Sequence, residues 1–178
     1  MRDIWERLEV LPEVPHPAEA RAAVLVPLYD DGDGDVRLVL TKRPDTMRTH
    51  PGDVVFPGGR MEDGEDPIRT ALREAREEIG LDENAIVEII GGLTPVTTRN
   101  RSMPIIPVVA RIERPPELFP DPSEVDAIIE PRLIDLLDDR AWRTSDWYGS
   151  KLWFYEFDEG TLWGATAFMV RELLDVIR

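Results

Sequence analysis

The chain has 178 residues, a length typical of one domain, and its composition of 42% hydrophobic and 32% charged residues is that of a folded globular protein. Cysteine is absent, which excludes disulfides, thiolate nucleophiles and cysteine-ligated metal sites, and the two histidines, His16 and His50, are too few for a histidine-rich metal site. The formal net charge of −15 disfavours nucleic-acid binding, which depends on neutralising phosphates, and it repels a polyanionic small molecule unless a cation mediates.

No run of the sequence approaches the roughly 18 apolar residues that a membrane helix needs. The N-terminal residues MRDIWERLEV carry charges where a secretory signal peptide needs an apolar stretch. We therefore expect a cytoplasmic protein without a membrane partner, organised as a single domain over residues 1–178. The lead-in over residues 1–20 predicts a short helix at 1–11 and then a Pro-rich link.

The next segment predicts a β-hairpin. Strands are expected at 21–29 and 36–43, joined by the turn sequence DDGDGD. The aspartates of this turn also suggest a calcium loop, but an EF-hand loop beginning at Asp31 needs Gly and Glu where Val36 and Lys42 stand. We therefore interpret the segment as a hairpin turn.

The clearest helix of the chain follows a loop over 44–53, a short strand over 54–57 and a Gly-Gly turn. Asp66 is a suitable N-cap and is followed by Pro at the first helical position. The sequence therefore predicts a helix over Pro67–Ile79, and Gly80 is the expected residue at its C-terminal end.

The second half of the chain predicts several strands and few helices. Strands are expected at 86–91, Ile105–Ile112, 124–129, 152–157 and 162–164. Helices are expected at 132–137 and 165–177. Because the order lacks a regular β-α-β alternation, it indicates a mixed sheet flanked by helices.

The predicted helix Pro67–Ile79 carries one apolar face and one face of glutamates. Glu74 and Glu78 are one turn apart, and Glu77 is three residues after Glu74, so each adjacent pair opposes helix formation by ~0.2–0.5 kcal/mol. Arg73 relieves only Glu77, its neighbour four residues on. A solvated Glu-rich surface is the ordinary alternative, whereas a purely structural surface more naturally alternates Glu with Lys or Arg.

A divalent cation resolves this conflict of charges. Mg²⁺ accepts carboxylates, keeps several waters and takes substrate phosphates as further ligands. Gly58 and Gly59 lie just before the helix, where glycine lets the backbone approach a ligand closely and present a carbonyl to the metal. The cation also supplies the positive charge that this acidic chain lacks.

These residues resemble the Nudix box, G-x5-E-x7-R-E-U-x-E-E-x-G-U, in which U is apolar. Every fixed position is matched, with a small apolar residue at the first U. The matching residues are Gly59, Glu65, Arg73, Glu74, Ala75, Glu77, Glu78, Gly80 and Leu81. The resemblance implies an α/β fold, an α/β/α sandwich around a mixed β-sheet, and hydrolysis of a nucleoside diphosphate linked to another moiety.

The resemblance also implies roles for these residues. The metal, Mg²⁺ or Mn²⁺, is assigned to Glu74, Glu77 and Glu78 together with the Gly59 carbonyl, and Glu74 and Glu78 are expected to be the tightest ligands. Arg73 is expected to orient the glutamates, and is counted with them as catalytic. Glu65 is expected to hold the loop before the helix and to support the metal site indirectly.

The segment over residues 38–59 is similar to the signature that precedes the box in coenzyme A pyrophosphatases, L-L-T-x-R-[SA]-x3-R-x3-G-x3-F-P-G-G. The matching residues are Leu40, Thr41, Arg43, Arg48, Gly52, Phe56, Pro57, Gly58 and Gly59. Val39 and Pro44 depart from the pattern. Arg43 and Arg48 present fork-shaped donors that suit phosphate oxygens, so we expect them, with Gly58 and Gly59, to bind substrate; a surface ion pair is the alternative for either arginine.

Other polar and aromatic residues are weaker candidates. Arg99 and Arg101 are candidates for a ribose phosphate, although a solvated loop is the simpler interpretation. His50 is expected to be a loop hydrogen-bonding residue rather than a base. The residues considered for stacking on adenine are Trp147, Trp153 and Tyr155.

The predicted reaction is attack of a water in line on one phosphorus of the diphosphate of coenzyme A, which gives 4'-phosphopantetheine and adenosine 3',5'-bisphosphate. A helix glutamate or Glu124 is expected to take the proton. The expected partner is a coenzyme A-like nucleotide, with no nucleic acid, and a homodimer is an open option. Alternatives are a Nudix hydrolase for ADP-ribose, NADH or a nucleoside triphosphate, and a catalytically silent Nudix-fold binding module.

Overall fold

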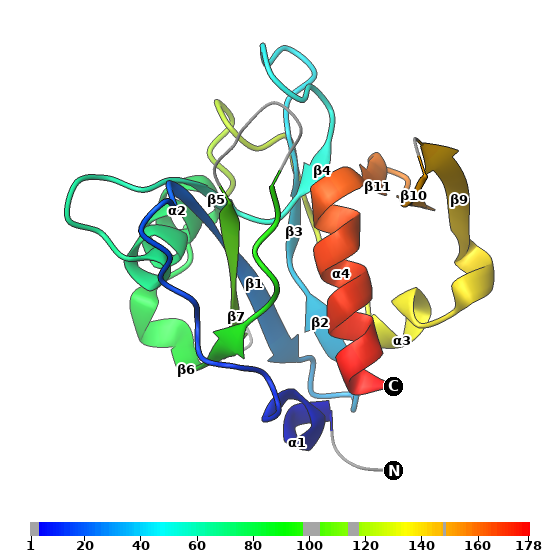
Figure 1. Ribbon diagram of the computed structural model, residues 1–178, viewed down its shortest axis with the longest axis horizontal. Coiled ribbons are helices and arrows are strands. Elements are labelled where there is room, and N and C mark those ends of the chain that lie inside the picture. The colour runs from blue at the N-terminus through cyan, green and yellow to red at the C-terminus, as the bar shows by residue number, and fades with distance from the viewer. Residues whose placement is uncertain (1–3, 98–103, 114–117, 148) are drawn as a thin grey trace.

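The computed structural model describes residues 4–97, 104–113, 118–147 and 149–178. Their strands form a five-stranded and a six-stranded mixed sheet, with helices packed beside and between them (Figure 1). This arrangement confirms the predicted mixed α/β class, with the strands divided between two sheets. No helix among the described residues is long and apolar enough to cross a bilayer.

The first sheet is built around β1, the longest of the described strands. Its neighbours are antiparallel β2 on one side and parallel β7 on the other, β6 follows β7 at the edge, and β5 pairs antiparallel with the start of β1. The strands are β1 (Ala22–Asp30), β2 (Val36–Leu38), β5 (Gly58–Arg60), β6 (Ile86–Gly92) and β7 (Ile105–Ile112).

The second sheet has the order β8-β3-β4-β11-β10-β9. Its strands are β3 (Leu40–Lys42), β4 (Val54–Val55), β8 (Ala127–Ile129), β9 (Trp142–Trp147), β10 (Ser150–Glu156) and β11 (Thr161–Trp163). The strand predicted over 36–43 thus belongs to both sheets. Val39 still donates to the Pro27 carbonyl at 3.1 Å, whereas Leu40 pairs with Ile129 of β8.

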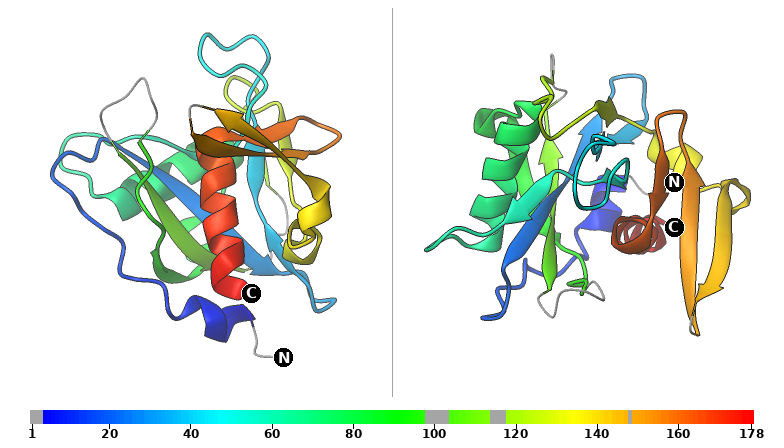
Figure 2. Two further views of the ribbon diagram at one scale, coloured as in Figure 1. Left: turned by 45° about the vertical axis from the view of Figure 1, so that its right-hand side comes forward. Right: turned by 90° about the horizontal axis from the view of Figure 1, so that it is seen from above.

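The helices separate the layers. Helix α2 (Pro67–Ile79) covers one face of the first sheet, and α4 (Gly164–Ile177) lies between the other face and strands β9 and β10 (Figure 2, right). Alternation along β1 serves both layers: Leu25 belongs to the core cluster beneath α2, and Val26 to the cluster beneath α4. The remaining helices are α1 (Ile4–Leu8) and α3 (Leu133–Leu136), with single 3₁₀ turns at Glu83–Ala85 and Asp139–Ala141.

The boundaries of α2 confirm the predicted caps. The Asp66 side chain accepts a hydrogen bond from the Arg69 N–H at 2.9 Å, which satisfies one of the free donors of the first turn. Gly80 adopts φ 68°, and its N–H donates to the Arg76 carbonyl at 3.0 Å. The helix therefore begins and ends at the predicted residues.

The predicted Gly-Gly turn is wrong, because Gly58 and Gly59 are strand residues of β5. They pair with Val24 and Ala23 of β1, respectively. A Cβ added at Gly58 would lie 2.4 Å from the Ala23 carbonyl oxygen, so a side chain at this position would force β5 away from β1. Glycine is required here for a close backbone approach.

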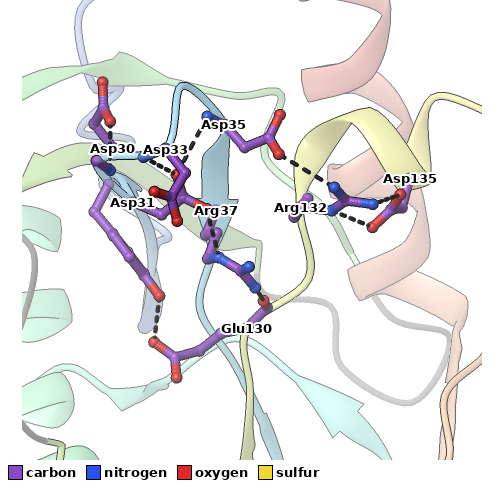
Figure 3. Close-up of polar contacts among 10 residues, drawn as sticks. Asp30, Asp31, Asp33, Asp35, Arg37, Glu130, Arg132 and Asp135 are labelled. Carbon is purple, nitrogen blue, oxygen red and sulfur yellow. Dashed lines mark hydrogen bonds and ion pairs between the residues drawn. The ribbon is translucent and has the colours of Figure 1, made fainter.

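The DDGDGD turn joins β1 to β2, which confirms the hairpin (Figure 3). Asp31 Oδ1 accepts from the N–H groups of Asp33 and Asp35 at 2.9 and 3.2 Å, and its Oδ2 accepts from Arg37 Nε at 3.0 Å. These bonds lower the pKa of Asp31. Arg132, at the N-terminus of α3, bonds Asp35 at 3.2 Å. The carboxylate of Asp31 thus bonds backbone donors and an arginine, and that of Asp35 bonds a second arginine.

Candidate active site

Glu78 lies on α2 against β5 and is nearly buried, with 6% of its surface exposed. Its Oε2 accepts a hydrogen bond from the Gly58 N–H at 3.1 Å. Burial raises the pKa of Glu78 to about 8, and the nearby charges of Glu74 and Glu124 add to that rise. The ionised form of Glu78 is therefore unfavourable in this environment, and a bound cation would stabilise it.

Glu74 lies one turn earlier and covers Gly59 of β5. A Cβ added at Gly59 would lie 2.5 Å from the Glu74 carboxyl carbon, so glycine leaves the space that this carboxylate occupies. Burial raises the pKa of Glu74, and the Arg73 guanidinium opposes that rise. Two carboxylates on one helix face are therefore held against the edge of the first sheet.

Arg73 connects the glutamates of α2 to the loop before the helix. It donates to Glu74 Oε1 at 2.9 Å, to Glu77 Oε2 at 3.2 Å and to the Arg60 carbonyl at 2.9 Å. Its fork also bonds both oxygens of Glu65, which holds the pKa of Glu65 at about 2. Arg73 therefore contacts two of the predicted metal ligands, Glu74 and Glu77, as well as the loop, an arrangement that suits the expected orienting role.

The donor set fits a small divalent cation. Within the described ranges, no group of three or more His, Cys, Asp or Glu side chains is gathered to hold a metal ion, and the Glu77 side chain is 52% exposed and bonded to Arg73. Mg²⁺, however, is ordinarily bound by one or two carboxylates, with waters and substrate phosphates completing its shell. Glu74 and Glu78, beside the space left by Gly59, match that pattern.

A further loop approaches the carboxylates from the C-terminal end of α2. Its backbone N–H groups at Phe119 and Asp121 donate to the carbonyls of Ile79 and Glu78 at 2.9 and 2.8 Å, which satisfies two free helix acceptors. The same loop carries Glu124, whose charge raises the pKa of Glu78. Glu124 is exposed and lies before β8, because the predicted strand 124–129 begins only at Ala127.

The two signature arginines are placed differently. The Arg43 backbone N–H donates to the Asp53 carbonyl at 2.9 Å, and its charge lowers the pKa of Glu78. The Nε of Arg43 is buried without a hydrogen-bond partner in the described part of the chain, a costly state that an oxygen of a ligand would relieve. Arg48 is exposed in the loop between β3 and β4.

The weaker candidates are also distributed over the fold. His50 bonds Asp53 at 3.1 Å in that loop and adopts φ 53°, consistent with the predicted hydrogen-bonding role. Arg99 and Arg101 lie outside the described residues. Trp153 and Tyr155 face α4, in contact with Trp142. Trp147 is 45% exposed at the end of β9.

Sequence reasoning missed Asp53 and Trp163. Trp163 Nε1 donates to Asp53 Oδ1 at 3.0 Å and so connects the loop before β4 to the start of α4. Phe154, the register partner of Trp163, was missed as well, although the alternation of side chains along 152–157 places it on the face opposite to Trp153 and Tyr155.

Two adjacent carboxylates beside an arginine whose Nε is buried and unpaired in the described part of the chain are typical of enzymes that act on phosphates. A family model described as the NUDIX domain matches residues 19–148. The chain belongs to the Nudix family, whose members generally use divalent metal ions.

Two curated relatives cover most of the chain. It is 37% identical over 175 residues to the peroxisomal coenzyme A diphosphatase ndx-8 of Caenorhabditis elegans, covering 94% of this chain and 74% of that protein. It is 39% identical over 158 residues to the mitochondrial Nudix hydrolase 15 of Arabidopsis thaliana, covering 83% of this chain. The chain spans about half the length of that plant protein, 55%.

Among solved structures, the fold is similar to that of a C. elegans Ap4A hydrolase, with a TM-score of 0.53 and 18% sequence identity. The match covers 66% of this chain and 83% of that one. At this identity the similarity supports the fold alone.

Proposed function

We propose that this protein hydrolyses the diphosphate of coenzyme A or one of its derivatives, with Mg²⁺ or Mn²⁺, in one domain over residues 1–178. The products are 4'-phosphopantetheine and adenosine 3',5'-bisphosphate. The observation that carries the proposal is the fold of the signature segment 38–59, in which Arg43 follows β3 beside Glu78 and Gly58 donates to the same carboxylate. The similarity to the nematode coenzyme A diphosphatase supports the same substrate.

The chain's own residues prepare the reaction. Glu74 and Glu78 would hold the metal with the Gly59 carbonyl, and Glu77 would complete the acidic face. A cation bound there supplies positive charge to the diphosphate and acidifies a bound water. Arg73 fixes Glu74, and the Gly58 N–H fixes Glu78, so both carboxylates are oriented before substrate arrives.

Arg43 and Glu124 complete the proposed site. The unpaired Nε of Arg43 donates to a phosphate oxygen, which removes the cost of a buried free donor. The proton of the attacking water passes to a carboxylate, and Glu124 suits this role because it is exposed and lies close enough to influence both Glu74 and Glu78.

Mass spectrometry of the products formed from coenzyme A and Mg²⁺ tests this function directly. Masses of 4'-phosphopantetheine and adenosine 3',5'-bisphosphate are the expected result. A panel with ADP-ribose, NADH and nucleoside triphosphates, read by phosphatase-coupled phosphate release, is the comparison. Preference for one of those substrates would replace coenzyme A, and tight nucleotide binding without turnover would instead indicate a binding module.

The cellular location and the oligomeric state stay predictions. The names of the relatives place those proteins in mitochondria or peroxisomes, whereas the sequence led us to expect the cytoplasm. Cell fractionation tests the location, and light scattering of the purified protein tests the homodimer.

A further inference from the structure

The strands β10 and β11 carry an aromatic pair on the face opposite to α4. Phe154 and Trp163 are register partners, and their rings are parallel within 4° with centroids 6.3 Å apart. The neighbouring Trp153 lies on the other face, where the Arg171 guanidinium is 4.2 Å from its ring centroid. The aromatic residues that face α4 are therefore part of the packing, whereas Phe154 and Trp163 line an open groove.

The charge in this groove is already balanced. The Arg143 guanidinium lies 6.0 Å from the Phe154 ring centroid, and it forms an ion pair with Glu156. Glu156 also accepts a hydrogen bond from Thr161 at 2.7 Å. A groove with paired charges and aromatic walls suits a flat, uncharged ring better than a phosphate.

Two connections join this groove to the candidate active site. Trp163 donates to Asp53, and the Asp53 carbonyl accepts from the backbone of Arg43, whose charge acts on Glu78. Along the chain, Val54 pairs with Leu162, and Gly58 follows four residues later. At ~3.3 Å per extended residue, Val54 and Gly58 are at most ~13 Å apart, so the strand that pairs with β11 leads directly to the Gly58 N–H that contacts Glu78.

We propose that the groove at Phe154 and Trp163 binds the nucleobase of the substrate by stacking, while its diphosphate lies at Glu74 and Glu78. The inference rests on the proposed function for the presence of a nucleotide, and it assigns the base to a surface on the second sheet. Stacking on an aromatic side chain contributes to affinity for any base, so the site favours nucleotides over phosphates that carry no base.

Calorimetric titration with AMP and with ribose 5-phosphate, both in Mg²⁺, tests this inference without turnover. Phe154→Leu keeps an apolar side chain but removes the aromatic face. We expect it to weaken AMP binding about 5-fold or more, in line with the effects of losing a stacking ring, and to leave ribose 5-phosphate unchanged. Phe154→Tyr, which keeps the ring, should restore AMP affinity.

Phe168→Leu is the matched control, because Phe168 is exposed on α4 in a different groove and undergoes the same chemical change. It should bind AMP like the parent. Equal AMP affinity in the parent and Phe154→Leu, a loss confined to Phe168→Leu, or no AMP binding by the parent up to several millimolar would overturn the inference. Thermal unfolding of each variant reports whether it is folded, and Trp163→Leu, which removes the other ring of the groove, replaces Phe154→Leu in the comparison if the latter unfolds.

The outcomes also separate this inference from the proposed function. If coenzyme A is not hydrolysed but AMP binding depends on Phe154, the stacking site stands and the substrate assignment fails. If coenzyme A is hydrolysed and the affinity for AMP is unchanged by Phe154→Leu, the substrate assignment stands and the base binds elsewhere.

Discussion

Arg73 binds Glu65 through two parallel hydrogen bonds, from Nε to Oε1 at 2.8 Å and from Nη2 to Oε2 at 3.1 Å. Glu65 also accepts from the Thr70 hydroxyl at 2.8 Å and from the Glu62 N–H at 3.0 Å. The loop before α2 is therefore tied to the same guanidinium that holds Glu74. Loop position and carboxylate orientation are coupled through one residue.

The first prediction follows from this fork. Arg73→Lys keeps the charge but cannot bond both Glu65 oxygens and Glu74 together, so it should lower the free energy of unfolding by about 1–3 kcal/mol. Urea unfolding measures the loss. Because Glu74 is also released, kcat/KM should fall more than in Arg69→Lys, an exposed change on the same helix. Equal activity in the two variants would assign Arg73 to stability alone.

Glu78→Gln tests the assignment of the buried carboxylate. The amide keeps the shape and an acceptor for the Gly58 N–H, but it removes a negative charge from the proposed metal site. Activity should fall on the order of 100-fold or more, while the fold is retained. Glu77→Gln, at a half-exposed position, should cost less. Steady-state kinetics measures both, and activity of Glu78→Gln within about threefold of the parent would contradict the ligand role.

The pH dependence of stability follows from the raised pKa of Glu78. In metal-free protein, burial raises the pKa of the Glu78 carboxyl in the folded state to about 8, from its ordinary value of 4.5. The stabilisation is fully present below the unfolded pKa and is lost as pH rises toward the folded pKa. The free energy of unfolding in EDTA should therefore fall on the order of 1–3 kcal/mol between about pH 5 and 8.

Glu78→Gln is the control for this dependence of the free energy of unfolding on pH, because its amide does not titrate. Denaturant unfolding in EDTA across the same pH range should show a flatter dependence for the variant. A slope as steep as in the parent would mean that another group is responsible.

Divalent cations should reverse the effect of the crowded carboxylates. Mg²⁺ binds the folded site but not the unfolded chain, so it should raise the melting temperature in a dose-dependent way. The triple variant Glu74→Gln, Glu77→Gln, Glu78→Gln should lose most of that increase. Differential scanning fluorimetry measures both, and equal shifts would place the cation elsewhere, for instance at the DDGDGD turn.

The parts of the fold that local chemistry specifies could be predicted from the sequence. Helix α2 begins after Asp66 and ends before Gly80 as expected, because both caps are adjacent to the helix they bound. Strand β9 was missed, since five of its six residues are exposed and give no apolar pattern. Its strand character depends on pairing with β10 rather than on its own side chains.

The site shows the same division between local and distant causes. The spacing of Glu74 and Glu78 on one helix face is visible in the sequence. The strand at Gly58 and Gly59 could not be predicted from the sequence, because it depends on a close approach to Ala23, which is far away in the chain. Likewise, the burial of Arg43 Nε is a tertiary property that no motif contains.

The two signature arginines should differ in what they recognise. Arg43 acts on Glu78 and has a buried unpaired Nε, whereas Arg48 is exposed on the loop between β3 and β4. Arg43→Ala should therefore lower kcat/KM for coenzyme A and for ADP-ribose together. A charged hydrogen bond is worth roughly 1.5–3 kcal/mol, so the expected fall is on the order of 10- to 100-fold.

Arg48→Ala should lower kcat/KM for coenzyme A more than for ADP-ribose, because only coenzyme A carries a separate ribose phosphate for an exposed guanidinium to bind. Both substrates are measured with both variants at fixed Mg²⁺, and Arg48→Lys, which keeps a charge, should recover part of the loss. A parallel fall for the two substrates would assign Arg48 to the common diphosphate. No fall for either would remove Arg48 from the site, and coenzyme A specificity would then depend on residues other than this arginine.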